Sequence, residues 1–127
     1  MKTSRTNSIG VVVARLANPL YPQLLQLLSD QLHKADLLMS VWESVPGFED
    51  RLLRSIGEGS VDGVLFATAT EGDIPLLKKL GEQRPVVLLN RTVEDASFDQ
   101  IGSDNLAGGK AVADYFLSRG RRCPGLI

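Results

Sequence analysis

IGVVVARLANPLYPQ (residues 9–23) joins a short apolar segment to a loop that contains an amide, two prolines and a tyrosine. The apolar part, residues 9–14, is rich in β-branched residues, which predicts a strand covered by helices on both faces. Beyond the loop, Leu24, Leu25, Leu28 and Leu32 recur at spacings of three and four, which predicts a helix with Pro22 in its first turn. A buried strand followed by an amphipathic helix is typical of α/β proteins.

The same alternation continues along the chain. Further strands are expected at residues 37–42, 61–67, 85–90 and 100–104, with 61–62 forming the turn into the third strand. Helices are expected around residues 48–56, at 74–82 and at about 105–119, where Gly120 is placed to end the last one. This order predicts an α/β fold with a doubly wound parallel sheet, Rossmann-like, with helices on both faces.

The bulk composition limits the classes of function. The 127 residues are enough for one domain, and the formal net charge of −1 gives no long-range attraction to nucleic acid or to an anionic membrane. No apolar stretch approaches the roughly 20 residues of a membrane span, and the first residues, MKTSRTNS, lack the apolar core of a secretory signal. Cys123 is the single cysteine, so no internal disulfide can form, and we expect a cytoplasmic location.

The loops lack the motifs of the common α/β enzymes. No glycine stands between Val13 and Leu24, where a dinucleotide-binding turn or a phosphate-binding loop needs several. The end of the first strand has no pair of carboxylates to hold magnesium. His33 and Cys123, each alone of its kind, do not form a zinc site or a nucleophile pair by themselves. We therefore expect neither enzymatic activity nor a cofactor.

The residues that follow the predicted strands favour a binding site instead. Ligands of such sheets bind beyond the carboxyl ends of the strands. Aromatic rings, amides and a guanidinium group together suit a small polyhydroxylated ligand, because rings cover C–H surface and planar groups make paired hydrogen bonds to hydroxyls. The candidate ligand-binding residues are Asn18, Leu20, Tyr21, Trp42, Thr68, Asn90, Arg91 and Asp104.

Several of these residues also have a purely structural interpretation. Asn18 can fix the turn before a helix, and Asp104 is a good N-cap for the helix that follows it. Tyr21 and Trp42 can simply cover the core, and Arg91 can pair at the surface with Glu94 or Asp95. From the residues alone both interpretations stay open.

The segments TNSIGVVVARLANPLYPQLLQLL, VDGVLFA, PVVLLNR and IGSDNLAGGKAVADYFLSRGRR together resemble the effector-binding core of the LacI/GalR family of bacterial transcription repressors. The pattern is shared more distantly with periplasmic sugar-binding proteins. This resemblance implies two similar lobes of the periplasmic-binding-protein-like type, with a ligand cleft between them. Residues 9–124 are then the amino-terminal lobe, 1–8 a remnant that follows a hinge helix or an added tail, and 125–127 the start of a crossing strand.

The resemblance also assigns roles to individual residues. NPLYP resembles the family's Asn-Pro-aromatic-aromatic motif, which places Asn18 and Tyr21 in the effector pocket and Leu20 where an aromatic residue is more usual. NR resembles an Asp-Arg pair that grips sugar hydroxyls, so Arg91 matches and Asn90 replaces the acid. Asp104 matches the aspartate of SDN.

The implied function is the sensing of an effector, expected to be a carbohydrate, by a repressor that binds operator DNA through a headpiece outside this chain. Such repressors act as homodimers, and exposed apolar positions of the first helix, such as Leu27, are candidates for the contact. The alternative is a sugar-binding protein that serves a transporter. Neither function involves insertion into a membrane.

Overall fold

The computed structural model describes residues 5–95 and 97–125, and its centre is a five-stranded sheet in the order β2-β1-β3-β4-β5. Every neighbouring pair of strands is parallel, which confirms the α/β fold with a parallel sheet. The strands are β1 (Ser8–Val13), β2 (Leu38–Glu43), β3 (Gly63–Phe66), β4 (Val86–Leu89) and β5 (Asp99–Ile101). The helices are α1 (Leu20–Lys34), α2 (Phe48–Gly57), α3 (Ile74–Gln83) and α4 (Asn105–Ser118), with a 3-10 turn at Glu71–Asp73.

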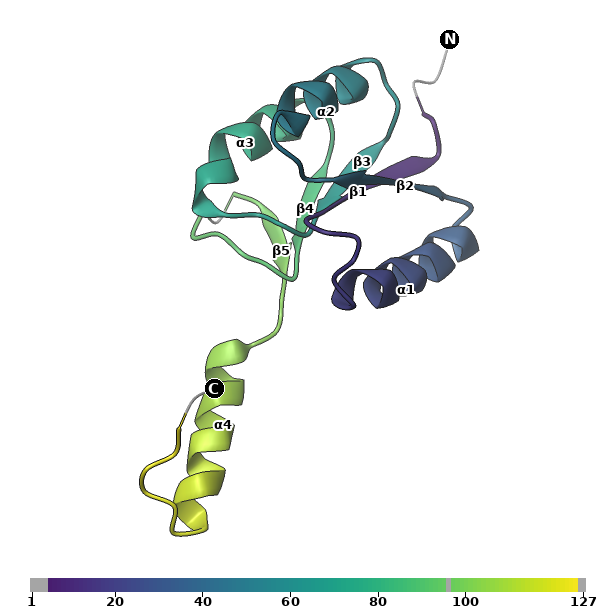
Figure 1. The fold of residues 1–127 in the computed structure, drawn as a ribbon. Helices are drawn as coiled ribbons and strands as arrows, with labels where there is room; N and C mark the ends of the chain where they lie inside the picture. The colour runs from purple at the N-terminus through teal and green to yellow at the C-terminus, as the bar shows by residue number, and fades with distance from the viewer. Residues whose placement is uncertain (1–4, 96, 126–127) are drawn as a thin grey trace.

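Helices lie on both faces of the sheet, as the sequence predicted. Figure 1 shows α2 and α3 together on one face and α1 alone on the other. The fifth strand is shorter than expected and ends at Ile101 rather than at residue 104. The reason is local, because the carboxylate of Asp104 accepts a hydrogen bond from the backbone N–H of Ala107 at 3.0 Å and so begins α4.

The face under α2 and α3 holds the larger part of the core, and we call it the closed face. Side chains of alternate strand residues point to it, as the two-residue period of a strand requires. Phe66, Leu77, Leu80 and Leu88 have no exposed surface there. The whole buried cluster consists of Val12, Phe48, Leu52, Ile56, Val61, Val64, Phe66, Ala69, Leu76, Leu77, Leu80, Val86, Leu88 and Val93.

The face under α1, which we call the open face, has a smaller core. Its buried members are Val11, Val13, Tyr21 and Ala67. The helix residues that pack against them, Leu24, Leu25 and Leu28, are only half-buried. One helix therefore covers the strands in the middle of the sheet and leaves the strands beyond them partly uncovered.

The last helix stands apart from this body. All residues of α4 are exposed, and Figure 1 shows the helix projecting beyond β5 on the side of the sheet where α1 lies. Its end is well formed: Gly120 has a φ of 72°, and the N–H groups of Gly120 and Arg121 donate to the carbonyls of Leu117 and Phe116. Gly120 thus ends the helix as predicted, in a Schellman arrangement.

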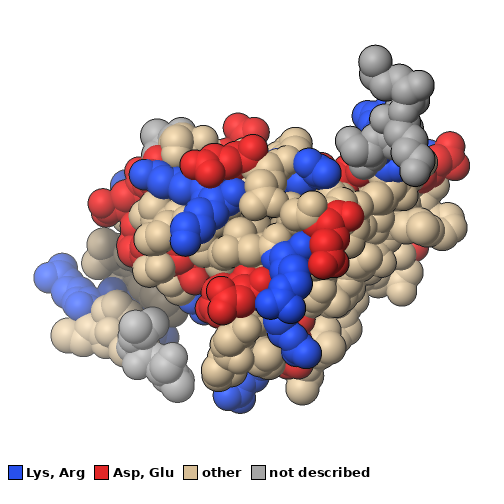
Figure 2. Space-filling view, turned by 90° about the horizontal axis from the view of Figure 1, so that it is seen from above, with Lys and Arg blue, Asp and Glu red and all other residues tan. Residues whose placement is uncertain are grey.

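Charges of both signs are scattered over the side of the molecule that Figure 2 shows. Figure 2 views the molecule from above and shows Lys and Arg interspersed with Asp and Glu on that side. This mixed pattern fits the formal net charge of −1, and this side of the molecule has no continuous basic surface of the kind that binds nucleic acid. None of the helices in the described parts of the chain has the length and hydrophobicity needed to cross a membrane.

Candidate ligand-binding site

The carboxyl ends of all five strands meet at one edge of the sheet, because every strand runs in the same direction. Five of the eight candidate residues lie in the loops that leave this edge. Leu20 and Tyr21 lie at the start of α1, and Trp42 lies near the end of β2. The question is which of these side chains the fold brings together.

The turn between β1 and α1 is held by its own hydrogen bonds. The side-chain oxygen of Asn18 accepts from the backbone N–H of Leu20 at 3.1 Å, and the Asn18 carbonyl accepts from the N–H of Tyr21 at 3.1 Å. Asn18 therefore performs the turn-forming role, while its exposed position leaves the side chain at the sheet edge. The proline at position 19 precedes the first helical residue, Leu20.

The two neighbouring residues of α1 have different environments. Tyr21 is only 4% exposed and packs against Val11, Val13 and Ala67 in the core of the open face. Leu20 is 48% exposed and points to a shallow hollow. The core interpretation of Tyr21 therefore has direct support in its packing, whereas Leu20 is the residue of this loop that borders open space.

This hollow is the site where sequence-predicted residues meet. It has a volume of about 270 Å³ and lies at the carboxyl ends of β4 and β5, next to the first turns of α1. Leu20 and Asn90 both line it, although they are 70 positions apart in the sequence. Its other lining residues are Leu24, Leu89, Ile101, Gly102 and Ser103.

Asn90 and Arg91 form a tight corner at the end of β4. The backbone of Asn90 is left-handed, with a φ of 69°, and asparagine is one of the few residues that adopt this conformation readily. Its N–H donates to the carbonyl of Ile101 at 2.8 Å, which fixes the corner to β5. Arg91 is exposed, and the ion pairs found in the described parts of the chain do not include it. Arg91 follows Asn90 in the chain but is not among the residues that line the hollow.

The pairings considered for Arg91 involve Glu94 or Asp95, and neither pairing is among the ion pairs of the described residues. The carboxylate of Asp95 has other partners. It accepts from the hydroxyl of Ser97 at 2.6 Å and lies 3.5 Å from the ammonium of Lys78. The hydrogen bond from the Ser97 hydroxyl, followed by the one from its backbone N–H, lowers the pKa of Asp95. Asp95 thus anchors its own turn to α3.

The remaining candidates lie elsewhere. Trp42 lies on β2, at the opposite side of the sheet from β4, and its ring packs against the core of the closed face. With neighbouring strands about 4.8 Å apart, β2 and β4 are roughly 14 Å apart. Thr68 is half-buried in the loop after β3, and Asp104 caps α4. The fold therefore does not gather all eight residues at one hollow.

Sequence reasoning missed most of the apolar lining of the hollow. Leu24, Leu89 and Ile101 belong to a helix and two strands, where an apolar residue is the normal expectation and gives no signal of a site. Gly102 and Ser103 follow the fifth strand directly, and only this position in the sequence could have indicated that they line a site.

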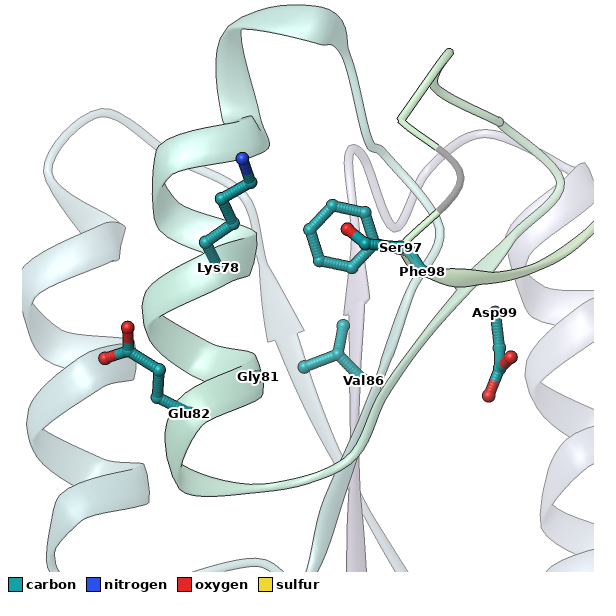
Figure 3. Close-up of a pocket in the computed structure, with 7 residues that line it drawn as sticks. All are labelled: Lys78, Gly81, Glu82, Val86, Ser97, Phe98 and Asp99. Atoms are coloured by element: carbon teal, nitrogen blue, oxygen red, sulfur yellow. The ribbon is translucent and has the colours of Figure 1, made fainter.

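A second hollow, of about 440 Å³, lies between α3 and β5. Figure 3 shows the ring of Phe98 above Val86, with Lys78 and Glu82 on the helix and Asp99 on the opposite side. Val86 and Asp99 are the first residues of β4 and β5, so this hollow lies toward the amino ends of the strands. None of the eight candidates lines it. In the part of the chain that the structure describes, no cluster of His, Cys, Asp or Glu residues could hold a metal ion.

Relatives of known function cover most of this chain. The HTH-type transcriptional regulator DegA of Bacillus subtilis is 26% identical over 121 residues, which are 91% of this chain and 36% of that protein. The sucrose operon repressor of Klebsiella pneumoniae is 28% identical over 108 residues, or 84% of this chain and 32% of the repressor. This chain spans about a third of the length of these relatives, which are named as a transcriptional regulator and an operon repressor. No family model matches the sequence.

Solved structures agree with the sequence relatives. The Cra regulator of Pseudomonas putida, in complex with fructose 1-phosphate, superposes with a TM-score of 0.73 at 21% identity, over 90% of this chain and 43% of the regulator. A LacI family transcriptional regulator of Lactobacillus casei, with bound sucrose, gives a TM-score of 0.71 at 23% identity, over 89% of this chain and 42% of that protein. The chain therefore shares the fold of these regulators over about nine-tenths of its length. The LacI-family resemblance noted in the sequence motifs is thereby confirmed.

Proposed function

We propose that this chain is the effector-sensing part of a LacI-family transcription repressor, and that its effector is a carbohydrate. The observation that carries the proposal is the similarity of about nine-tenths of the chain to transcription regulators, both in sequence and in fold. The sucrose operon repressor and the sucrose-bound and fructose 1-phosphate-bound regulators support a sugar or sugar phosphate as the ligand class. These regulators favour a repressor over a solute-binding protein of a transporter.

The proposed mechanism uses a ligand cleft between two lobes, of which this chain forms one side at the carboxyl edge of its sheet. Residues 9–124 form the amino-terminal lobe, and a second lobe closes over the ligand. Leu20 and Asn90 line the hollow, where Leu20 offers an apolar contact for the C–H surface of a sugar and the amide of Asn90 bonds to its hydroxyls. Arg91, the next residue, is proposed from the sequence resemblance to bond to hydroxyls or to a phosphate through its guanidinium group. Asn18, Tyr21, Trp42, Thr68 and Asp104 remain candidates at the same edge, with Tyr21 and Trp42 acting from the core.

Ligand binding then biases one relative orientation of the two lobes. It can do so only by the difference between its affinities for the two orientations. In a homodimer this bias changes the spacing of two DNA-binding headpieces, and hence the affinity for operator DNA. The protein works in the bacterial cytoplasm and needs no cofactor.

The test is a titration of the chain followed by two-dimensional amide NMR, which detects the weak binding expected of half a cleft. Fructose 1-phosphate, sucrose, glucose and a nucleobase are added in turn to the 127-residue chain. We expect one of the sugars to shift the amide signals of Leu20, Asn90, Arg91 and Ser103. Arg91→Ala should abolish these shifts, whereas Arg54→Ala, which removes an exposed arginine of α2 far from this edge, should leave them unchanged.

Two results would contradict the proposal. If no sugar moves any signal at millimolar concentration, the hollow is not a carbohydrate site. If the shifts fall on the hollow between α3 and β5 instead, the ligand binds at the amino ends of the strands and Arg91 has no part in it.

A further inference from the structure

The segment that follows β4 is tied to two consecutive residues of β5. The backbone N–H of Asn90 donates to the carbonyl of Ile101 at 2.8 Å. The N–H of Val93 donates to the side-chain oxygen Oε1 of Gln100 at 2.7 Å. Residues 91 and 92 therefore form a short span between two fixed points, and neighbouring residues of β5 supply both acceptors.

Gln100 makes a second hydrogen bond with the other end of its amide. Its Nε2 donates to the carbonyl of Asp95 at 2.9 Å. The side chain is half-buried, and its two bonds serve an N–H and a carbonyl of the same segment. Backbone groups that are shielded from water need such partners. The amide of Gln100 thus takes the place of a neighbouring strand after β4 has ended at Leu89.

The segment beyond the span is also held by the body of the protein. Val93 is only 7% exposed and belongs to the core of the closed face. The N–H of Glu94 donates to a carboxylate oxygen of Glu71 at 2.9 Å, and Asp95 is attached to α3 through Lys78. These contacts fix the segment to α3 and to the 3-10 turn, and Gln100 fixes it to β5 as well.

The span passes along the wall of the hollow at the carboxyl ends of β4 and β5. Gly102 lines that hollow, and a methyl group placed on it would lie 3.4 Å from Cγ2 of Thr92 and 3.8 Å from the carbonyl oxygen of Asn90. The N–H of Arg91 donates to the carbonyl of Leu89 at 2.8 Å, which closes a three-residue turn around Asn90. The backbone from which the Arg91 side chain extends is therefore held close to a residue of the hollow.

The place of this backbone matters because the Arg91 side chain is long and exposed. A ligand that binds such a side chain loses affinity to the entropy of ordering it, and a backbone that moved as well would add to the loss. A fixed span raises the affinity of a ligand that Arg91 binds. Gln100 itself is not among the residues that line the hollow, so it acts without touching the ligand.

We propose that Gln100 is a positioning residue of the effector site. Its side-chain amide bridges Val93 and Asp95 and thereby holds the span that carries Arg91 beside the hollow. The proposal rests on the proposed sensing function, because it takes Arg91 as a ligand-binding residue. Neither the position of Gln100 inside β5 nor the resemblance in the sequence assigns it this role.

The first test needs no ligand. Gln100→Met keeps the length of the side chain but removes both hydrogen bonds. In the free 127-residue chain it should lower the hydrogen-exchange protection of the Val93 amide about tenfold. The backbone order parameters of residues 91 and 92 should fall from about 0.85 to below about 0.6. Gln100→Glu keeps an acceptor for the Val93 N–H and should retain most of the protection. If residues 91 and 92 stay rigid in Gln100→Met, Gln100 does not position them and the proposal is wrong.

The second test compares affinity with stability. The chain is titrated with fructose 1-phosphate, sucrose and glucose, and the dissociation constant is measured for the compound that shifts the amide signal of Asn90. Gln100→Met should raise this constant at least about fivefold, because the span is no longer ordered before binding. Two controls should leave it unchanged. Ile56→Val reduces the buried core of the closed face, and Gln26→Met removes a glutamine hydrogen bond from α1.

The outcomes separate this proposal from the proposed function. If the unmodified chain binds none of the sugars, the sensing function fails and the role of Gln100 fails with it. If the unmodified chain binds a sugar and Gln100→Met binds it equally well, sensing stands and the role of Gln100 alone is wrong. That role is also wrong if Ile56→Val weakens binding as much as Gln100→Met does at an equal loss of stability in urea, because the effect then comes from stability and not from position.

Discussion

The two faces of the sheet are built from the same five strands but are covered very differently. The closed face lies under α2 and α3, and its central side chains have no exposed surface. The open face has only α1, and apart from the buried Tyr21 the inner residues of that helix are only half-buried. The strand order explains the difference. The sheet grows from β1 to β2 in one direction and through β3 to β4 in the other, so right-handed crossovers put α1 on one face and α2 and α3 on the opposite one.

The helices that connect the parallel strands therefore do not fully cover both faces of the sheet. No helix lies between β4 and β5 in the described chain, so no crossover helix covers the open face beneath these strands. In the described chain α4 is the next helix, and it stands away from the sheet. The stability of the two faces should therefore respond differently to substitution.

The largest effect is expected on the closed face. Phe66→Ala removes a side chain with no exposed surface, which packs against Phe48 with ring centroids 6.3 Å apart, and should lower the free energy of unfolding by about 3–5 kcal/mol. Ile101→Ala on the open face should change it by less than about 0.5 kcal/mol at concentrations where the chain is monomeric. Urea unfolding followed by circular dichroism measures both. Equal costs would mean that the two faces are covered alike in the monomer.

A smaller effect is expected at the edge of the closed face, where Gly10 lies beneath the ring of Trp42. A methyl group at position 10 would fall 2.1 Å from Cζ3 of that ring, so the indole must move. Gly10→Ala should cost about 1–3 kcal/mol of unfolding free energy. In a Trp42→Ala background the same change should cost almost nothing, because the obstacle is gone. An equal cost in both backgrounds would show that the backbone, not the indole, excludes a side chain at this position.

A more local effect is expected at the start of α4. Asp104→Ala removes the N-cap bond to Ala107 and should cost about 1 kcal/mol. Because α4 lacks packing in the monomer, the loss should appear as reduced helical signal rather than as a lower midpoint of global unfolding. Asp104→Asn keeps a capping oxygen and is the matched control. A drop in the global midpoint with Asp104→Ala alone would show that α4 is already packed on the body.

The fold could be predicted from the sequence because its signals are local. The β-branched run of residues 9–14 and the leucine spacing after Pro22 each fix an element without reference to the rest of the chain. Gly120 identified the end of α4 for the same reason. The placement of α4 relative to the sheet could not be predicted, because an apolar helix pattern predicts that a helix is buried but not which surface buries it.

The candidate site was predictable only in part. Position after a strand correctly brought Leu20 and Asn90 to one hollow, because parallel strands bring their carboxyl ends together. The position of a residue after a strand does not predict that Tyr21 is buried in the core or that Trp42 packs on the closed face. The direction of a side chain depends instead on helix phase and strand register. The ligand-binding role of each of the eight residues stays a prediction.

The smallest expected effect involves neither face but the segment that leads into β1. The carboxylate of Asp62 accepts hydrogen bonds from the backbone N–H groups of Thr6 and Asn7, at 2.8 and 2.9 Å, and from the hydroxyl of Thr6 at 3.2 Å. The bond from the Thr6 N–H is the main cause that holds the pKa of Asp62 below its usual value of 3.8. The stabilising effect is therefore complete above that usual value and disappears as the pH falls through the lower pKa of the folded state.

Hydrogen exchange at the amides of Thr6 and Asn7 measures this directly. After correction for the intrinsic pH dependence of exchange, their protection should be constant at neutral pH and fall below a pH of about 3.8, while the protection of Val12 in the central strand stays unchanged. Asp62→Asn retains one acceptor oxygen but no charge, so it should lower the protection of both amides at neutral pH and remove the acid transition. If the transition persists in Asp62→Asn, another carboxylate holds the segment. Since Thr6 and Asn7 touch neither the closed nor the open face, their loosening should leave the costs of Phe66→Ala and Ile101→Ala as far apart as before.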